Sequence, residues 1–158
     1  MMRPVAGSLT SIVLLAAWLG AAVLVAAVVA PAAFAVLPTR TLAGALVGRV
    51  LPVVFWSGMV VGLVVAALGW STSGSAWRMA AGITLALSSA IAQLGITPRI
   101  EAIRASVGGP IDALDPIDPR RQAFGRLYGM SVAWMGVGAI AATFALVLLV
   151  RAVSRNSP

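Results

Sequence analysis

Long apolar runs separated by short polar segments dominate the sequence. A bilayer core about 30 Å thick requires about 20 apolar residues in helical form, and four runs meet this requirement. The predicted transmembrane helices cover residues 9–34, 50–70, 79–98 and 124–150. We therefore predict an all-α, polytopic integral membrane protein in which residues 1–158 form a single domain, a four-transmembrane-helix bundle.

The first apolar run has a second interpretation. Arg3 precedes it and an Ala-Phe-Ala sequence lies near its end, as in a secretory signal peptide. The apolar region of a signal peptide spans about 7–15 residues, and this run is clearly longer. We therefore expect the first helix to remain in the membrane.

The polar connections differ in character. Residues 36–48 separate the first two predicted helices, and residues 71–77 form a tight turn rich in Ser and Gly. The extramembrane loop, residues 99–122, contains all four acidic residues. Apolar residues recur at helical spacing over 99–107, which predicts a short interfacial helix. The Gly-Gly-Pro sequence at 108–110 ends that helix.

Composition supports a membrane protein. The chain is 61% hydrophobic and 9% charged, whereas soluble proteins carry about 25% charged residues. So few polar side chains cannot cover a surface that faces water. Lipid is therefore the expected surroundings of most side chains.

The formal net charge is +7, from 11 arginines and four acidic residues. The arginines flank the apolar runs and do not gather in one patch, so we expect no nucleic-acid partner. In these positions they anchor helices at the membrane interface and contact anionic lipids of the bilayer.

The arginines also predict the orientation in the membrane. The first and third connections carry seven of them, and the termini together with the second connection carry four. The positive-inside rule places the larger set in the cytoplasm, so we expect a multi-pass protein of the cell inner membrane with periplasmic termini. The larger set is Arg40, Arg49, Arg99, Arg104, Arg120, Arg121 and Arg126, and the smaller set is Arg3, Arg78, Arg151 and Arg155.

Small and weakly polar residues form stripes on three of the predicted helices. Helices in lipid pack closely through such residues, so the stripes indicate either the bundle interior or a polar path for a substrate or partner. We assign Gly58, Gly62, Gly82 and Gly138 to helix packing, and Ser89, Gln93, Tyr128 and Ser131 to a polar seam or partner face.

Catalytic and metal-binding chemistry has little support. The chain has no Cys and no His, which excludes disulfides, thiolate or imidazole ligands and the usual general base. No charged residue lies near the middle of a predicted span, where proton-coupled pumps usually need one. We therefore expect no enzymatic activity and no cofactor.

Asp112, Asp115 and Asp118 recur at every third position and have two interpretations. A calcium site would use carboxylates, but this spacing is not that of an EF-hand loop. Asp118 followed by Pro119 is typical of a helix start, with Asp as the N-cap and Pro at the first helical position. The helix start is the preferred interpretation.

Several short motifs occur in the order of a known family. They are Trp18-Leu19-Gly20, Pro31 and Phe34, Ala43-Gly44, Thr97-Pro98-Arg99-Ile100, and Phe124, Leu127, Gly129 and Ser131. In these motifs the chain resembles an uncharacterised four-helix membrane family that includes the eukaryotic transmembrane protein 205. The resemblance implies a four-helix fold. The eukaryotic relative is associated with resistance to a platinum drug, which suggests export or trafficking.

Two positions depart from that family. Tyr128 and Met135 stand where the family often has His and Asn. If those two side chains carry an activity of the family, this chain lacks it or performs it differently.

Two classes of function follow. The first is a small transport-related or resistance-related membrane protein, which can act as a homo-oligomer because four helices enclose little pathway alone. The alternative is an accessory or structural subunit that docks on a larger membrane complex through its small-residue faces.

Overall fold

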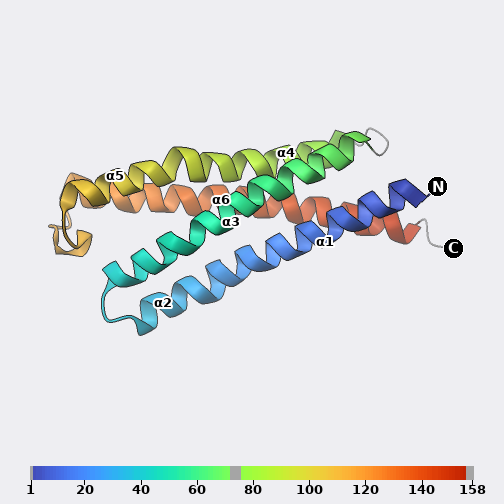
Figure 1. Cartoon of the computed structure of the whole chain (residues 1–158). Helices are drawn as coiled ribbons and strands as arrows, with labels where there is room; N and C mark the ends of the chain where they lie inside the picture. The colour runs from blue at the N-terminus through green and yellow to red at the C-terminus, as the bar shows by residue number, and fades with distance from the viewer. Residues whose placement is uncertain (1, 72–75, 156–158) are drawn as a thin grey trace.

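The computed structural model describes residues 2–71 and 76–155, and these residues form no strand. These residues form four long helical segments, which run side by side (Figure 1). Two of them contain a π-helical stretch, and a short 3-10 turn lies in the last connection. In chain order the segments are α1 (Met2–Leu24), a π-helix (Val25–Val29) and α2 (Ala30–Val36); α3 (Arg40–Ser71); α4 (Ala76–Ala90), a π-helix (Ile91–Ile96) and α5 (Thr97–Val107); and, after the 3-10 turn (Ile111–Ala113), α6 (Pro119–Arg155).

Each helical segment is long and apolar enough to cross a membrane. The four candidate spans are Gly7–Val36, Thr41–Trp70, Ala76–Val107 and Pro119–Arg155. At 1.5 Å per residue the shortest of them is about 45 Å long, so the segments exceed the hydrocarbon core and reach the headgroup regions. The predicted all-α fold with four transmembrane helices is confirmed.

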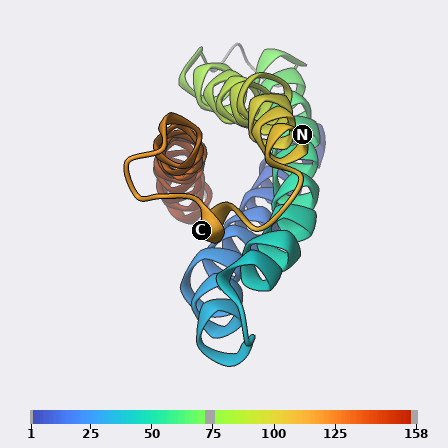
Figure 2. The same ribbon diagram turned by 90° about the vertical axis from the view of Figure 1, so that its left-hand side faces the viewer.

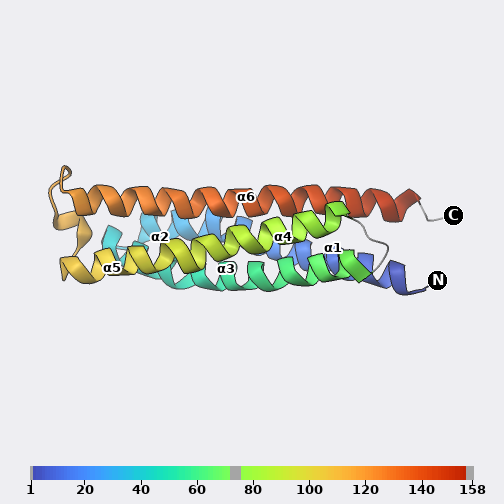
Figure 3. The ribbon, with the colours of Figure 1, turned by 90° about the horizontal axis from the view of Figure 1, so that it is seen from above.

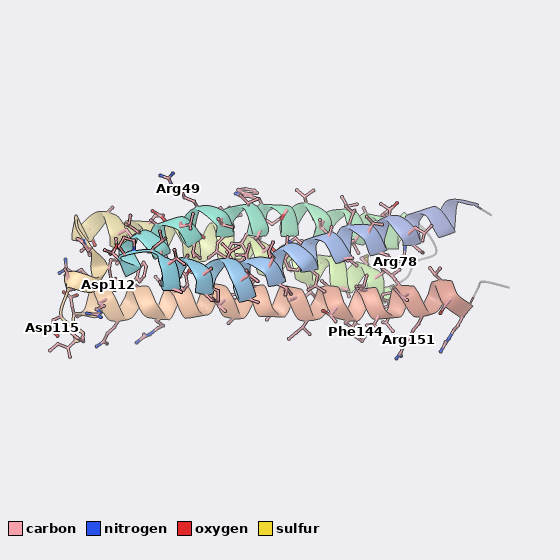
Figure 4. The ribbon with its side chains drawn as sticks, turned by 90° about the horizontal axis from the view of Figure 1, so that it is seen from below. Arg49, Arg78, Asp112, Asp115, Phe144 and Arg151 are labelled. Atoms are coloured by element: carbon pink, nitrogen blue, oxygen red, sulfur yellow. The ribbon has the colours of Figure 1, made fainter. Side chains whose placement is uncertain are left out.

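The two ends of the bundle carry different parts of the chain. Both termini lie at one end, with the end of α3 and the start of α4 (Figures 1 and 3). The α2–α3 and α5–α6 connections lie at the opposite end, which we call the loop end. The two sets of arginines predicted from the sequence therefore belong to opposite ends. Figure 4 shows Arg78 and Arg151 far from Asp112 at the loop end. The side chains of Arg3 and Arg40 lie outside the described part of the chain.

The core is narrow and lies along the axis of the bundle. Leu15 and Trp18 of α1, Val65 of α3, Leu85 of α4 and Leu149 of α6 are buried and belong to one cluster. Many large apolar side chains, by contrast, point outward on all four segments. Such extensive apolar exposure is unfavourable in water, and it is the arrangement expected where lipid surrounds the helices.

The closest helix contact joins α3 and α4, which are antiparallel. A Cβ added at Gly62 would lie 2.6 Å from the Ala86 nitrogen and the Gly82 oxygen. A Cβ added at Gly82 would lie 2.6 Å from the Ala66 nitrogen and the Gly62 oxygen. The contact is thus reciprocal, and backbone meets backbone because neither glycine has a side chain.

The helices extend further than the predicted spans. The segment after the first span was predicted to be a connection over 36–48, but α3 begins at Arg40, where the Thr39 hydroxyl accepts a hydrogen bond from the Leu42 N–H at 3.2 Å. The charge of Arg49 set the start of the predicted span, whereas the Thr39 cap sets where the helix begins.

The predicted loop over 99–122 is also shorter in the structure. The helix predicted over 99–107 forms as part of α5, but it continues α4 through the π-helix and is not a separate element. It ends where Gly108 adopts a left-handed conformation with φ of 63°, which glycine adopts at little cost.

The helix start predicted at Asp118 and Pro119 is confirmed, five residues before the predicted span 124–150. Pro119 is the first residue of α6, and Asp118 Oδ1 accepts a hydrogen bond from the Arg120 N–H at 2.8 Å. Asp118 also forms an ion pair with the Arg120 guanidinium at 2.9 Å. These hydrogen bonds from Arg120 lower the pKa of the Asp118 carboxyl.

Candidate functional site

Arg104 lies on α5 with its guanidinium against the backbone of α3. Its Nη2 donates a hydrogen bond to the Gly44 carbonyl oxygen at 3.0 Å. Its Nη1 lies 3.4 Å from Glu101 Oε1, one turn earlier on the same helix. A Cβ at Gly48 would lie 3.1 Å from Nη1. The guanidinium is therefore seated where two glycines, four residues apart, leave the surface of α3 open.

Two aromatic residues of α6 complete the surroundings of Arg104. The Arg104 Cζ lies 5.5 Å from the centroid of the Phe124 ring, a cation–π distance. Phe124 and Tyr128 are one helical turn apart, and their rings stack with centroids 6.2 Å apart. The guanidinium is thus held between the backbone of α3 and an aromatic face of α6, so its orientation is fixed from both sides.

A pocket of about 370 Å³ opens beside this guanidinium. It lies at the loop end, where α2 diverges from α6 (Figure 2). Most of its wall is apolar or aromatic, and its charged lining residues are Arg104 and Asp112. The lining residues are Phe34 of α2; Thr41, Gly44 and Ala45 of α3; Arg104 of α5; Gly109, Ile111 and Asp112 of the connection; and Phe124 and Tyr128 of α6.

A second, more open hollow of about 610 Å³ adjoins the pocket. Thr41 and Asp112 line both of them. Arg121 lines the second hollow as well, and its Nη1 donates a hydrogen bond to the Leu114 carbonyl oxygen at 2.7 Å. That bond ties the α5–α6 connection to the start of α6, so the outer mouth has a defined shape.

A small void of about 20 Å³ lies on the other side of Arg104. Besides Arg104, its polar lining residues are Thr97, Glu101, Tyr128 and Ser131. A cavity of this volume is large enough for about one water molecule. Two of the residues assigned to a polar seam, Tyr128 and Ser131, are therefore brought together with Arg104.

Comparison with known proteins gives a family but no activity. A family model described as a domain of unknown function (DUF4149) matches residues 13–107. The chain belongs to this family. No curated protein and no solved structure matches the chain.

The DUF4149 match divides the site between two parts of the chain. Gly44, Gly48 and Arg104 lie inside the matched residues, whereas Phe124 and Tyr128 of α6 follow them. The part of α3 that contacts the guanidinium thus lies within the family domain, whereas Phe124 and Tyr128 of α6 lie after the matched residues.

The other two residues assigned to the seam, Ser89 and Gln93, do not line the pocket at Arg104. Ser89 is buried on α4 in close contact with Gly58 of α3, beside the Trp18 indole. Gln93 lies in the second π-helix, and its Oε1 is buried with no hydrogen-bond partner within residues 2–71 and 76–155. The four residues therefore do not form one continuous seam in the described structure.

The four glycines assigned to helix packing all lie where another helix approaches closely. Gly62 and Gly82 face each other, and Gly58 faces Ser89. A Cβ at Gly138 of α6 would lie 2.8 Å from the Ser88 hydroxyl of α4. At Gly62 and Gly82 the nearest atoms belong to the backbone, so these two positions have room for hydrogen only.

Two of the three aspartates of the α5–α6 connection have local partners for their carboxylates, whereas Asp112 accepts a hydrogen bond from Arg121 through its backbone oxygen at 3.5 Å. Asp118 caps α6, and Asp115 Oδ1 accepts a hydrogen bond from the Ile117 N–H at 2.9 Å. Within the described ranges, no group of three or more His, Cys, Asp or Glu residues lies close enough to hold a metal ion. These carboxylates shape the connection and the mouth of the pocket.

Sequence reasoning missed Arg104 as a site residue and counted it only as a topology signal. Two features of the sequence belong to residues that surround it in the structure. Gly44 and Gly48 form a small-residue pair outside the predicted spans, and Phe124 and Tyr128 are aromatic residues one turn apart at the start of a helix. Nothing in the sequence alone joins these pairs to Arg104, because they are far apart along the chain.

Proposed function

We propose that this member of the DUF4149 family is a small transport-related protein of the inner membrane, with its working site at the pocket beside Arg104. The observation that carries the proposal is the pocket itself. Its volume of about 370 Å³ falls in the range of about 300–1,000 Å³ typical of small-molecule sites. It also combines a fixed cation with aromatic walls at one end of a membrane bundle.

The proposal includes an orientation. The loop end carries the larger set of arginines, so the positive-inside rule favours a cytoplasmic pocket and periplasmic termini. A C-terminal alkaline phosphatase fusion is expected to be active, because this enzyme folds only in the periplasm. An inactive fusion together with an active cytoplasmic reporter at the same position would reverse the orientation.

Within the family, we propose a relation to proteins like transmembrane protein 205. The support is the order of short motifs, among them Trp18-Leu19-Gly20 and Thr97-Pro98-Arg99-Ile100. Tyr128, one of the two departures from that pattern, lines the pocket, and the other, Met135, packs against the buried core. The substitution at Tyr128 therefore alters the wall of the proposed site.

Cellular accumulation of toxic compounds tests the transport role. A deletion strain would be compared with strains that carry the wild-type chain, Arg104→Gln or Arg126→Gln, across a panel of growth inhibitors. Arg126 is a matched control because it is an exposed arginine of α6 at the same end. For at least one compound we expect the wild-type chain and Arg126→Gln to restore the wild-type level and Arg104→Gln to fail. Equal accumulation in all strains would refute the role.

A specific feature favours the second candidate, an accessory subunit of a larger membrane complex. A shallow, wholly apolar hollow of about 550 Å³ lies along α3 beside Trp56, whose side chain is about half exposed. Pro52 and Val61 lie at its two ends along the helix. A transmembrane helix of another protein fits a hollow of this kind, since helices in lipid associate by close packing.

A further inference from the structure

We infer that the pocket beside Arg104 binds an amphiphile with one acidic head group and an apolar tail. The inference rests on the proposed function, since it names the class of ligand for that site. Its support is the placement of the charges, the donors and the apolar walls around the pocket.

The guanidinium of Arg104 would bind the acidic head group. An arginine has five N–H donors in a planar fork that fits a carboxylate or phosphate. Within the described part of the chain, Arg104 forms hydrogen bonds only to the Gly44 oxygen and to Glu101, the latter long at 3.4 Å. Donors therefore remain for a ligand, and the guanidinium is already fixed in place.

The apolar and aromatic side chains that line the rest of the pocket would contact the apolar tail. Phe34 of α2 faces the pocket from one side, and Phe124 and Tyr128 of α6 face it from the other. These three aromatic side chains, with Ala45 and Ile111, give the pocket its apolar lining. A tail held there exchanges lipid for aromatic and aliphatic contacts, while the head group remains at Arg104.

The charge of Asp112 limits the head group. Asp112 lines both the pocket and the outer hollow, so a second negative charge on the ligand would meet a carboxylate. A head group with a single acidic function avoids that repulsion. Removing the carboxylate in Asp112→Asn is therefore expected to strengthen binding.

A fluorescent fatty acid, 11-(dansylamino)undecanoic acid, is the probe for the test. It would be titrated into the full chain in phosphatidylcholine nanodiscs, and the dansyl emission would be recorded. Loss of a charge-assisted hydrogen bond predicts that Arg104→Gln binds the probe about tenfold to a hundredfold more weakly. Arg126→Gln is expected to bind like the wild type. Equal binding by the wild type and Arg104→Gln would overturn the inference.

A second variant covers the case in which Arg104→Gln does not fold. Ala45 is an exposed residue of α3 that lines the pocket, so Ala45→Phe fills the space without removing a charge. We expect Ala45→Phe to abolish probe binding while the protein elutes as the wild type on sizing in detergent. Unchanged binding in Ala45→Phe, or unchanged or weaker binding in Asp112→Asn, would contradict the proposed position of the ligand.

Competition identifies the source of the acidic amphiphile. Displacement of the probe by phosphatidylglycerol in the nanodisc assigns a membrane lipid, and displacement by oleate assigns a free fatty acid. Displacement by neither, or equal displacement by methyl oleate, overturns the inference. If the inference fails while Arg104→Gln still alters compound accumulation, the transport role stands with another ligand. If the probe binds but accumulation never changes, the transport role falls and the ligand class stands.

Discussion

Gly62 and Gly82 bring the backbones of α3 and α4 into direct contact, and Gly62→Ala tests that contact with a single carbon atom. The added Cβ would lie 2.6 Å from the Ala86 nitrogen and the Gly82 oxygen, and 3.0 Å from the Ala86 Cα. All of these are backbone atoms, so no side-chain rotation can make room. The two helices must move apart for the variant to fold.

The magnitude follows from two opposing effects. Overpacking a tight site costs about 1–3 kcal/mol, and backbone contacts place Gly62→Ala toward the upper part of that range. Replacing Gly by Ala in a helix returns about 1 kcal/mol through helix propensity. Gly20→Ala is the matched control, because a Cβ there meets nothing within 4 Å. The two variants should therefore differ in the free energy of unfolding by about 1–3 kcal/mol, the cost of overpacking.

Unfolding in mixed micelles with increasing SDS, followed by circular dichroism, measures this difference. We expect Gly20→Ala to unfold at the same SDS fraction as the wild type or a higher one, and Gly62→Ala at a lower one. Gly62→Leu should unfold more readily still. Equal midpoints for Gly62→Ala and Gly20→Ala would show that α3 and α4 are not in backbone contact.

The same assay checks three further predictions. Trp18→Phe should lower the free energy of unfolding by about 1 kcal/mol or more, because the buried indole Nε1 donates a hydrogen bond to the Val54 oxygen at 3.0 Å. Unchanged stability would contradict a contribution from that hydrogen bond. Gln93→Met should raise the free energy of unfolding by about 1–3 kcal/mol, because the substitution removes a buried acceptor without a partner in the described ranges. A loss of stability would show that the Gln93 amide forms a hydrogen bond. Asp118→Ala should be less stable than the wild type at pH 7. Because Arg120 lowers the pKa of the Asp118 carboxyl in the folded state, its contribution is full above the unfolded pKa of about 3.9. The difference should become smaller as the pH falls through the folded pKa, and a difference that does not change with pH would contradict the pairing.

The four-helix fold was predictable because hydrophobic length is a strong signal in a membrane protein. The start of α6 was predictable as well, since Asp118 and Pro119 carry a local capping signal. The start of α3 was not. Residues 41–48 are mostly apolar, but the predicted span began only after the charged Arg49, whereas the helix begins at Arg40 beside the Thr39 cap. The joining of α4 to α5 through a π-helix has no sequence signal that we recognise.

The candidate site was predictable only in part. Tyr128 and Ser131 were identified by their polarity on a helix face, and both lie next to Arg104. The role of Arg104 depends on contacts with Gly44 and Phe124, which are distant in the sequence and meet only when α3, α5 and α6 pack. Ser89 and Gln93 share the polarity of Tyr128 but lie elsewhere, because polarity alone does not say which neighbouring helix a side chain faces.

The central claim is that this chain acts by itself through the pocket beside Arg104. The most direct measurement is purification of the tagged chain from its own membranes in mild detergent, followed by sizing and mass spectrometry. We expect recovery of the chain alone, as a monomer or a homo-oligomer. Stoichiometric recovery of a different membrane protein that is released by substitutions at Trp56 would contradict it and identify the chain as an accessory subunit.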